Sequence, residues 1–284
     1  MVGADRPLKR ERTVTRARVV RSERLSRHMV RLVLGGEGIA LLDPTPFTDR
    51  YIKLVFAPEV AGQRERLRTY TVRSWDTVRD EITVDFVVHG DAGLAGPWAA
   101  GAVPGDEISF VGPGGAYAPP TDAAWHLFVG DESALPAIAA ALEVLPAGAR
   151  AKVFVEVGST EDELELTTDA APVDGELVTW VHRDRPRSFA SPSPSPSPSP
   201  SPGATLVEVV SSWEPPAETP DVFLHGDAGF VRDLRRYLRL ERSVPAGRMS
   251  ASGYWRRGRT EEGWRSEKRE WAAAVEADEA GLAG

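Results

Sequence analysis

Residues 127–136 read Leu127-Phe128-Val129-Gly130-Asp131-Glu132-Ser133-Ala134-Leu135-Pro136, a short apolar run that passes through a glycine turn into a helical pattern. Apolar side chains then recur at helical spacing, at Leu135, Ile138, Ala139 and Leu142. Further short apolar runs follow at residues 153–155, 177–181, 206–210 and 222–224. Buried strands that alternate with helices are typical of a parallel sheet. The sequence therefore predicts an α/β domain over residues 121–284.

The first 120 residues have a different pattern, with short strand-like segments separated by glycine and proline turns. The segment Ile82-Thr83-Val84-Asp85-Phe86 alternates apolar and polar side chains, as a strand with one buried face does. This pattern predicts an antiparallel barrel over residues 1–120. A chain of 284 residues also exceeds the usual size of one hydrophobic core, so we expect two domains.

Two polar segments need a separate interpretation. Residues 191–202 form a Ser-Pro repeat, whose prolines have no N–H to donate to a sheet, so we predict a solvated loop between two strands of the second domain. Residues 6–31 carry ten Lys and Arg side chains against two acids. A nucleic-acid arm would interleave aromatic residues with these charges, and none is present. We therefore predict that this segment is a solvated first strand.

The overall composition narrows the function classes. The net charge of -8 argues against broad affinity for nucleic acid or an anionic membrane, because both require a positive field. No apolar run approaches the ~20 residues that span a bilayer, and no signal peptide is evident, so the expected location is cytoplasmic. The chain has no cysteine, which excludes Cys-type zinc sites and Cys-held iron-sulfur clusters. If the protein transfers electrons, a bound organic cofactor must carry them.

The segment Arg68-Thr69-Tyr70-Thr71 offers a cation, an aromatic face and a hydroxyl within four residues. A flavin dinucleotide uses such groups: a guanidinium for its pyrophosphate, a ring against the isoalloxazine or ribityl, and a donor near the ring edge. A surface strand could hold the same residues without a ligand, so the motif by itself is a weak signal.

A second segment, His89-Gly90-Asp91-Ala92-Gly93, leads through Ala95, Gly96 and Pro97 to Trp98. A glycine-rich turn that enters a helix exposes backbone N–H groups, which suit an anionic ligand. The same five-residue string recurs at His225-Gly226-Asp227-Ala228-Gly229, again between a strand and a helix. We attribute the repeat to a shared strand-turn-helix geometry rather than to duplication.

Taken in order, these segments resemble the siderophore-interacting proteins of the ferredoxin-reductase superfamily, over roughly residues 14–272. The Gly105-Asp106 and Gly112-Pro113-Gly114-Gly115 turns and the ending Ala251-Ser252-Gly253-Tyr254-Trp255-Arg256 belong to the resemblance. It implies a six-stranded antiparallel Greek-key barrel that binds FAD and a parallel-sheet domain that binds NADH or NADPH, with a C-terminal helical tail at residues 254–284. The implied activity is reduction of ferric siderophores for intracellular iron release.

The resemblance also assigns site residues. The cofactor-binding residues it implies are Arg68, Thr69, Tyr70, Thr71, His89, Asp91, Ala92, Ala95, Gly96, Pro97, Trp98, Gly130 and Asp131. Many relatives have a serine near Gly96, whose hydroxyl can face the pyrophosphate. This chain offers only backbone N–H groups there, which puts a side-chain contact at that position in doubt. Asp131 and Glu132 equally suit the N-terminus of a helix as dipole-compensating acids.

For the siderophore, the resemblance implies Lys53 and Arg256. The alternatives are an outward lysine on an edge strand and an arginine in a surface turn. Trp264 and Trp271 are seven residues apart, which predicts that both pack on the body from one helical face. Whether the tail also covers the nicotinamide side of the flavin is left open.

The electron donor is not decided by the sequence. Glu161, Asp162 and Glu163 would repel a 2′-phosphate, whereas Arg183, Arg185 and Arg187 could bind one. Reduced ferredoxin is a third donor. No acid–base catalytic group is assigned, because one-electron reduction of iron requires none. The alternative functions are a non-catalytic flavoprotein that holds a siderophore and a general flavin-dependent reductase.

Overall fold

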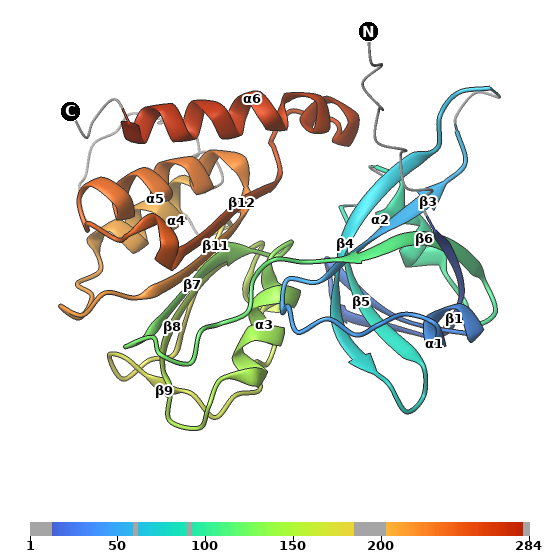
Figure 1. Cartoon of the computed structure of the whole chain (residues 1–284), viewed down its shortest axis with the longest axis horizontal. Coiled ribbons are helices and arrows are strands. Elements are labelled where there is room, and N and C mark those ends of the chain that lie inside the picture. The colour runs from blue at the N-terminus through green and yellow to red at the C-terminus, as the bar shows by residue number, and fades with distance from the viewer. Residues whose placement is uncertain (1–12, 59–61, 90–92, 185–202, 281–284) are drawn as a thin grey trace, which may run out of the picture.

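The computed structural model describes residues 13–58, 62–89, 93–184 and 203–280. Its N-terminal half is a closed barrel in which each strand pairs antiparallel with both neighbours, in the order β1-β2-β5-β4-β3-β6 (Figure 1). The strands are β1 (Val14–Ser26), β2 (Met29–Gly35), β3 (Tyr51–Phe56), β4 (Arg66–Asp76), β5 (Glu81–Val87) and β6 (Glu107–Gly114), with helices α1 (Glu37–Ala40) and α2 (Ala95–Gly101). Ile82, Val84 and Phe86 are fully buried in the barrel core, which confirms the predicted alternation.

The C-terminal half is a parallel sheet in the order β10-β8-β7-β11-β12, with the short β9 paired to β8. Its strands are β7 (His126–Asp131), β8 (Arg150–Val157), β9 (Ala171–Pro172), β10 (Val178–His182), β11 (Asp221–Asp227) and β12 (Met249–Trp255). Its helices are α3 (Leu135–Val144), α4 (Ala204–Ser212), α5 (Ala228–Leu240) and α6 (Glu261–Ala280), with single turns η1 (Thr160–Asp162) and η2 (Ala246–Arg248). The predicted fold, an antiparallel barrel followed by a parallel α/β sheet, is confirmed.

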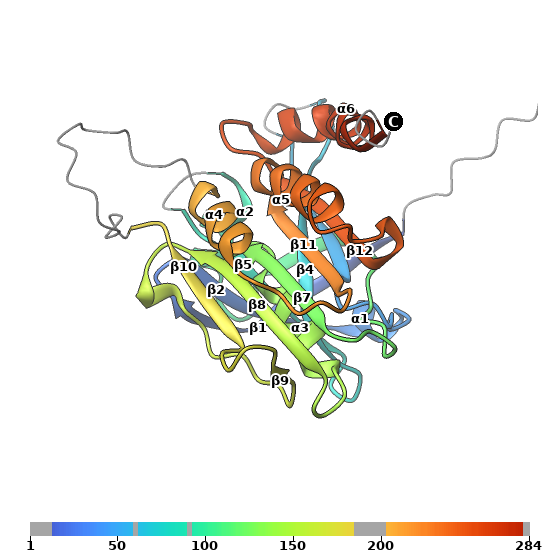
Figure 2. The ribbon, with the colours of Figure 1, turned by 90° about the vertical axis from the view of Figure 1, so that its left-hand side faces the viewer.

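The sheet is buried on both faces, which explains its continuous apolar runs. On β7, Phe128 packs in one cluster with α3, whereas Leu127 and Val129 pack in another with α4 and α5. Figure 2 shows α4 and α5 together on the face away from α3. Helix α3 also contacts β4, so it lies between the sheet and the barrel.

The predicted strand at residues 206–210 is wrong, because these residues lie in helix α4. Leu206 and Val210 are four residues apart and both buried, while Glu208 between them is exposed. This is the spacing of an amphipathic helix. The Ser-Pro repeat is therefore flanked by strand β10 and helix α4 rather than by two strands. Residues 191–202 lie outside the described residues.

Side-chain contacts fix the barrel against the sheet. The Tyr117 hydroxyl donates to Asp221 Oδ1 at 2.8 Å, and Arg73 Nη1 donates to Glu143 Oε2 at 2.8 Å. At the end of β1, the Ser26 hydroxyl donates to Asp162 Oδ1 at 3.0 Å. Three separate side-chain contacts therefore hold the two halves together. The strand predicted within residues 6–31 is also present, as β1.

The C-terminal tail folds back over the sheet as helix α6, and its first turn reaches strand β4 of the barrel (Figure 1). Trp264 is buried, and its Nε1 donates to the Tyr254 carbonyl at 3.1 Å. A Cβ at Gly253 would lie 2.8 Å from the Trp264 ring, so the glycine makes room for this anchor. The Trp264 and Trp271 rings are 5.5 Å apart, as their spacing predicted. Within the described residues, no helix is both long and apolar enough to cross a membrane.

Candidate functional site

The two motifs predicted for the flavin meet around one buried ring. The Tyr70 ring on β4 lies 4.4 Å from the Phe86 ring, and Trp98 on α2 lies 5.9 Å from the same ring. Tyr70 is half-buried and packs against the barrel core. Burial raises the pKa of its hydroxyl, which therefore stays protonated. An aromatic surface supported by Phe86 and Trp98 is thus ready to contact a planar ligand.

Arg68 extends from the same strand, two residues before Tyr70. Its Nη1 donates to the Leu67 carbonyl at 3.1 Å and to Glu262 Oε1, in the first turn of α6, at 2.6 Å. Thr69 is exposed next to it and pairs across the ladder with Lys53. The predicted cation is therefore in place on β4, and an acid from the tail holds it.

Thr71 begins a polar network that connects the barrel to the sheet. It is buried near the Tyr254 hydroxyl, whose pKa is raised by burial and by the charge of Asp49, while Thr71 opposes the rise. The same hydroxyl lies 3.0 Å from Nδ1 of His225, and Nε2 of His225 lies 2.9 Å from the Ser250 hydroxyl. His225 and Tyr254 were not among the site residues predicted from the sequence. The available signal was a histidine in a buried strand, directly before a glycine turn.

Asp131 ends strand β7 and organises the carboxyl edge of the sheet. Its Oδ2 accepts from Trp255 Nε1 at 2.8 Å and from the Asp227 N–H at 2.9 Å. Burial raises the pKa of this carboxyl to about 6, opposed by its hydrogen bonds. Gly226 has φ of 140°, and a Cβ there would lie 2.7 Å from Asp131 Oδ2, so this approach requires glycine. Asp131 is thus a structural acceptor as well as a candidate cofactor residue.

Arg183 lies in a buried acidic cluster beside this edge. Its Nη1 donates to Glu132 Oε2 at 2.8 Å and lies 3.5 Å from Glu156 Oε1. Glu132 also accepts from the Gly158 N–H at 3.0 Å. Arg183 thus pairs with two buried carboxylates. Arg185 and Arg187 lie outside the described residues.

The structure describes only part of the second predicted motif, the segment from His89 to Trp98. His89 faces the Glu132 cluster, and burial lowers the pKa of its imidazole, while the charge of Glu132 opposes that shift. Ala95, Gly96, Pro97 and Trp98 form the start of α2, where no side chain caps the first turn. A Cβ at Gly130 would lie 2.7 Å from the Ala134 Cβ, so the turn after β7 leaves no room for a side chain there. Asp91 and Ala92 lie outside the described residues.

Three cations lie near the barrel-facing end of the tail. Lys53 is on β3, which pairs with both β4 and β6, so the edge-strand interpretation is wrong. Burial lowers the pKa of Lys268 on α6, and the charge of Lys53 lowers it further, which places the two ammonium groups in one electrostatic environment. Arg256 is 44% exposed and donates to Glu267 at 3.2 Å. Lys268 was not among the siderophore-binding residues predicted from the sequence.

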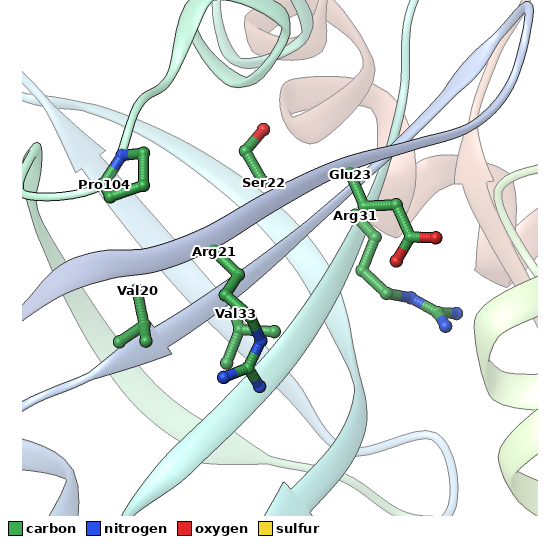
Figure 3. A pocket seen from close by; sticks show the side chains of 7 residues that line it. All are labelled: Val20, Arg21, Ser22, Glu23, Arg31, Val33 and Pro104. Atoms are coloured by element: carbon green, nitrogen blue, oxygen red, sulfur yellow. The ribbon is translucent and has the colours of Figure 1, made fainter.

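Other features do not compete with this site. A hollow on the outer barrel surface is lined by Val20, Arg21, Ser22, Glu23, Arg31, Val33 and Pro104 (Figure 3). Its two arginines pair with Glu81 and Asp85, so they offer no free charge to an anion. The described ranges contain no cluster of three or more His, Asp or Glu side chains that could hold a metal ion.

The residues present fit an FAD. A guanidinium, an aromatic face and a buried hydroxyl follow each other on β4, where the first turn of α6 and Tyr254 of the sheet approach the barrel. These are the groups that a pyrophosphate, an isoalloxazine and its ring edge require.

Comparisons with known proteins agree with this arrangement. Residues 18–65 and 60–117 match the siderophore-interacting FAD-binding domain, and residues 123–258 match the siderophore-interacting protein family. An uncharacterised protein of Mycobacterium tuberculosis is 46% identical over 90% of this chain and 95% of its own. The ferric vibriobactin reductase ViuB of Vibrio cholerae is 30% identical over 88% of this chain and 92% of its own.

A solved structure extends the likeness to the fold. The siderophore-interacting protein SipS from Aeromonas hydrophila superposes with a TM-score of 0.76 and 28% identity, over 92% of this chain and 99% of that chain. The barrel-plus-sheet architecture is therefore ferredoxin-reductase-like. Both domain models and full-length relatives agree, and the chain belongs to the siderophore-interacting protein family.

Proposed function

We propose that this protein is an FAD-dependent reductase of ferric siderophores, which takes electrons from NADH or NADPH. The observation that carries the proposal is the β4 strand of an FAD-binding domain. Arg68, Tyr70 and Thr71 lie there, Lys53 lies on the neighbouring strand β3, and Lys268 of α6 senses the charge of Lys53. The name of the Vibrio cholerae relative, a ferric vibriobactin reductase, supports the same activity.

The proposed division of labour follows the two halves of the chain. Residues 1–120 form the FAD domain, in which Arg68 binds the pyrophosphate, Tyr70 lies against the flavin and Thr71 hydrogen bonds to its edge. Residues 121–284 form the nicotinamide domain, in which the turn after β7, with Gly130 and Asp131, closes on the donor. In open α/β sheets ligands bind at the carboxyl ends of the strands, which is where Asp131 lies.

The chemistry requires little of the protein beyond orientation and charge. An FAD held at β4 would supply two-electron acceptance from a nicotinamide and one-electron delivery to iron, so that one donor molecule would reduce two ferric complexes. Reduction to Fe(II) weakens the hold of hard oxygen ligands and releases the metal. Lys53, Lys268 and Arg256 would attract an anionic ferric complex to the cleft. No side chain has to transfer a proton to iron.

Steady-state reduction tests this function. FAD-loaded protein is mixed with ferric siderophore, an Fe(II) chelator and either NADH or NADPH, and chelate colour is followed. We expect saturation with siderophore and competition between siderophores and artificial acceptors. Colour formation without such competition would indicate a general flavin reductase, and tight siderophore binding without colour would indicate a binding protein.

A further inference from the structure

The only carboxylate that the described residues place on Arg68 comes from the far end of the chain. Glu262 Oε1 lies 2.6 Å from Arg68 Nη1, although 194 positions separate the two residues in sequence. The Arg68 side chain is 13% exposed and the Glu262 side chain 53% exposed. The contact therefore joins a largely buried guanidinium to a carboxylate that is half exposed to solvent.

The helix that carries Glu262 is firmly held. Thr260 caps α6 by accepting the Gly263 N–H at 3.2 Å, and Trp264 is buried against Gly253. Glu262 is thus two residues from the buried Trp264, which fixes the backbone of Glu262 at the start of the helix. Its own side chain is half in solvent and can rotate away without movement of the helix.

Glu262 also places negative charge beside Arg68, which disfavours the binding of an anion there. The Arg68 hydrogen bond lowers the pKa of Glu262, so it is ionised at neutral pH. Glu261 next to it is half-buried, and burial raises the pKa of its carboxyl despite the charge of Arg68. Two adjacent acids therefore face the one guanidinium that is proposed to bind a doubly charged pyrophosphate. The two carboxylates and the pyrophosphate carry charge of the same sign, so they would repel each other at Arg68.

We infer that Glu262 competes with the FAD pyrophosphate for Arg68, so that the tail helix sets cofactor affinity through an exchange of anions on one guanidinium. The inference rests on the proposed placement of FAD at Arg68 and adds a residue that opposes binding. In the FAD-free protein, Glu262 satisfies a cation that burial would otherwise leave unpaired. The FAD-loaded protein has the stronger anion on Arg68 and Glu262 in solvent.

Equilibrium binding of FAD to stripped protein, followed by quenching of flavin fluorescence, tests the exchange. Glu262→Gln keeps the shape and removes the charge, and we expect it to tighten FAD binding by about 5-fold at low salt. Glu270→Gln removes an exposed charge from the same helix and should change the Kd by less than about 2-fold. Riboflavin lacks the pyrophosphate, so its Kd should be the same for wild type and Glu262→Gln.

Arg68→Ala separates this inference from the proposed function. It should weaken FAD binding, and in that background Glu262→Gln should have no further effect. If Arg68→Ala weakens FAD binding but Glu262→Gln alone leaves the Kd unchanged, the exchange is wrong and the placement of FAD stands. If Arg68→Ala binds FAD as tightly as wild type, the placement itself is wrong. Glu262→Ala serves as a second charge-removing variant should Glu262→Gln fold poorly.

Discussion

The Tyr254 hydroxyl lies 3.0 Å from Nδ1 of His225, and the two side chains belong to neighbouring parallel strands of the sheet. Phe223 stacks on the other side of the imidazole, with ring centroids 3.8 Å apart. His225 is therefore enclosed, and both of its ring nitrogens depend on side-chain hydroxyls.

Loss of the Tyr254 hydroxyl should destabilise the protein. Tyr254→Phe leaves Nδ1 of a buried imidazole without its partner, and we expect the free energy of unfolding to fall by about 1–3 kcal/mol. Urea denaturation measures the change. Tyr237→Phe is the matched control, because its hydroxyl bonds to a carbonyl on half-buried Ser211 that water can reach, and a smaller loss is expected. Equal losses in both variants would contradict the role given to the network.

Acid should destabilise the protein through His225. Burial and the charge of Lys268 lower the pKa of its imidazole to about 3, whereas the unfolded chain titrates near 6.5. The unfolded state then binds more protons, so this contribution is complete above pH 6.5 and is lost as the pH falls toward 3. His225→Asn should flatten the stability profile in that window. An unchanged slope between pH 6 and pH 4 would show that His225 is not the group responsible.

Arg183 should matter for folding and not for the choice of donor. Arg183→Ala leaves Glu132 and Glu156 buried without their cation, which costs about 3–5 kcal/mol in comparable buried pairs. The ratio of kcat/KM for NADPH to that for NADH should stay at the wild-type value. This ratio does not depend on the fraction of molecules that fold, because both values are measured on the same active molecules. A selective loss of activity with NADPH would instead show that Arg183 binds the 2′-phosphate.

Lys53 should accelerate capture of an anionic siderophore. Lys53→Ala is expected to lower the association rate constant by about 3- to 10-fold at low ionic strength, with the difference shrinking as salt is added. Stopped-flow quenching of flavin or tryptophan fluorescence reports this rate. Arg79→Ala removes an exposed cation from the turn between β4 and β5 and serves as control. If both variants behave alike, Lys53 has no specific role in docking.

The sequence predicted most of the fold because its periodicities are clean. Ile82 to Phe86 alternate with period two and line the barrel, and the helical spacing after Leu135 is that of α3. The strand prediction for residues 206–210 failed because a five-residue stretch of leucine and valine around one glutamate fits a strand and a helix equally well. Only the burial of Leu206 and Val210 on one face separates the two.

The site was predictable where one segment carries it and not where distant segments meet. Arg68 to Thr71 could be interpreted alone, because all their groups lie on one strand. The partners Glu262, Tyr254 and Lys268 come from the far end of the chain, and their relevance depends on how α6 folds back on the barrel. Local pattern does not encode that packing.

Anaerobic mixing of the reduced, FAD-loaded protein with a ferric siderophore and an Fe(II) chelator tests the central claim most directly. We predict that flavin absorbance returns as the chelate colour forms, with two Fe(II) chelates for each flavin reoxidised. A flavin that stays reduced, with no chelate colour in the presence of bound ferric siderophore, would contradict the assignment as a ferric-siderophore reductase.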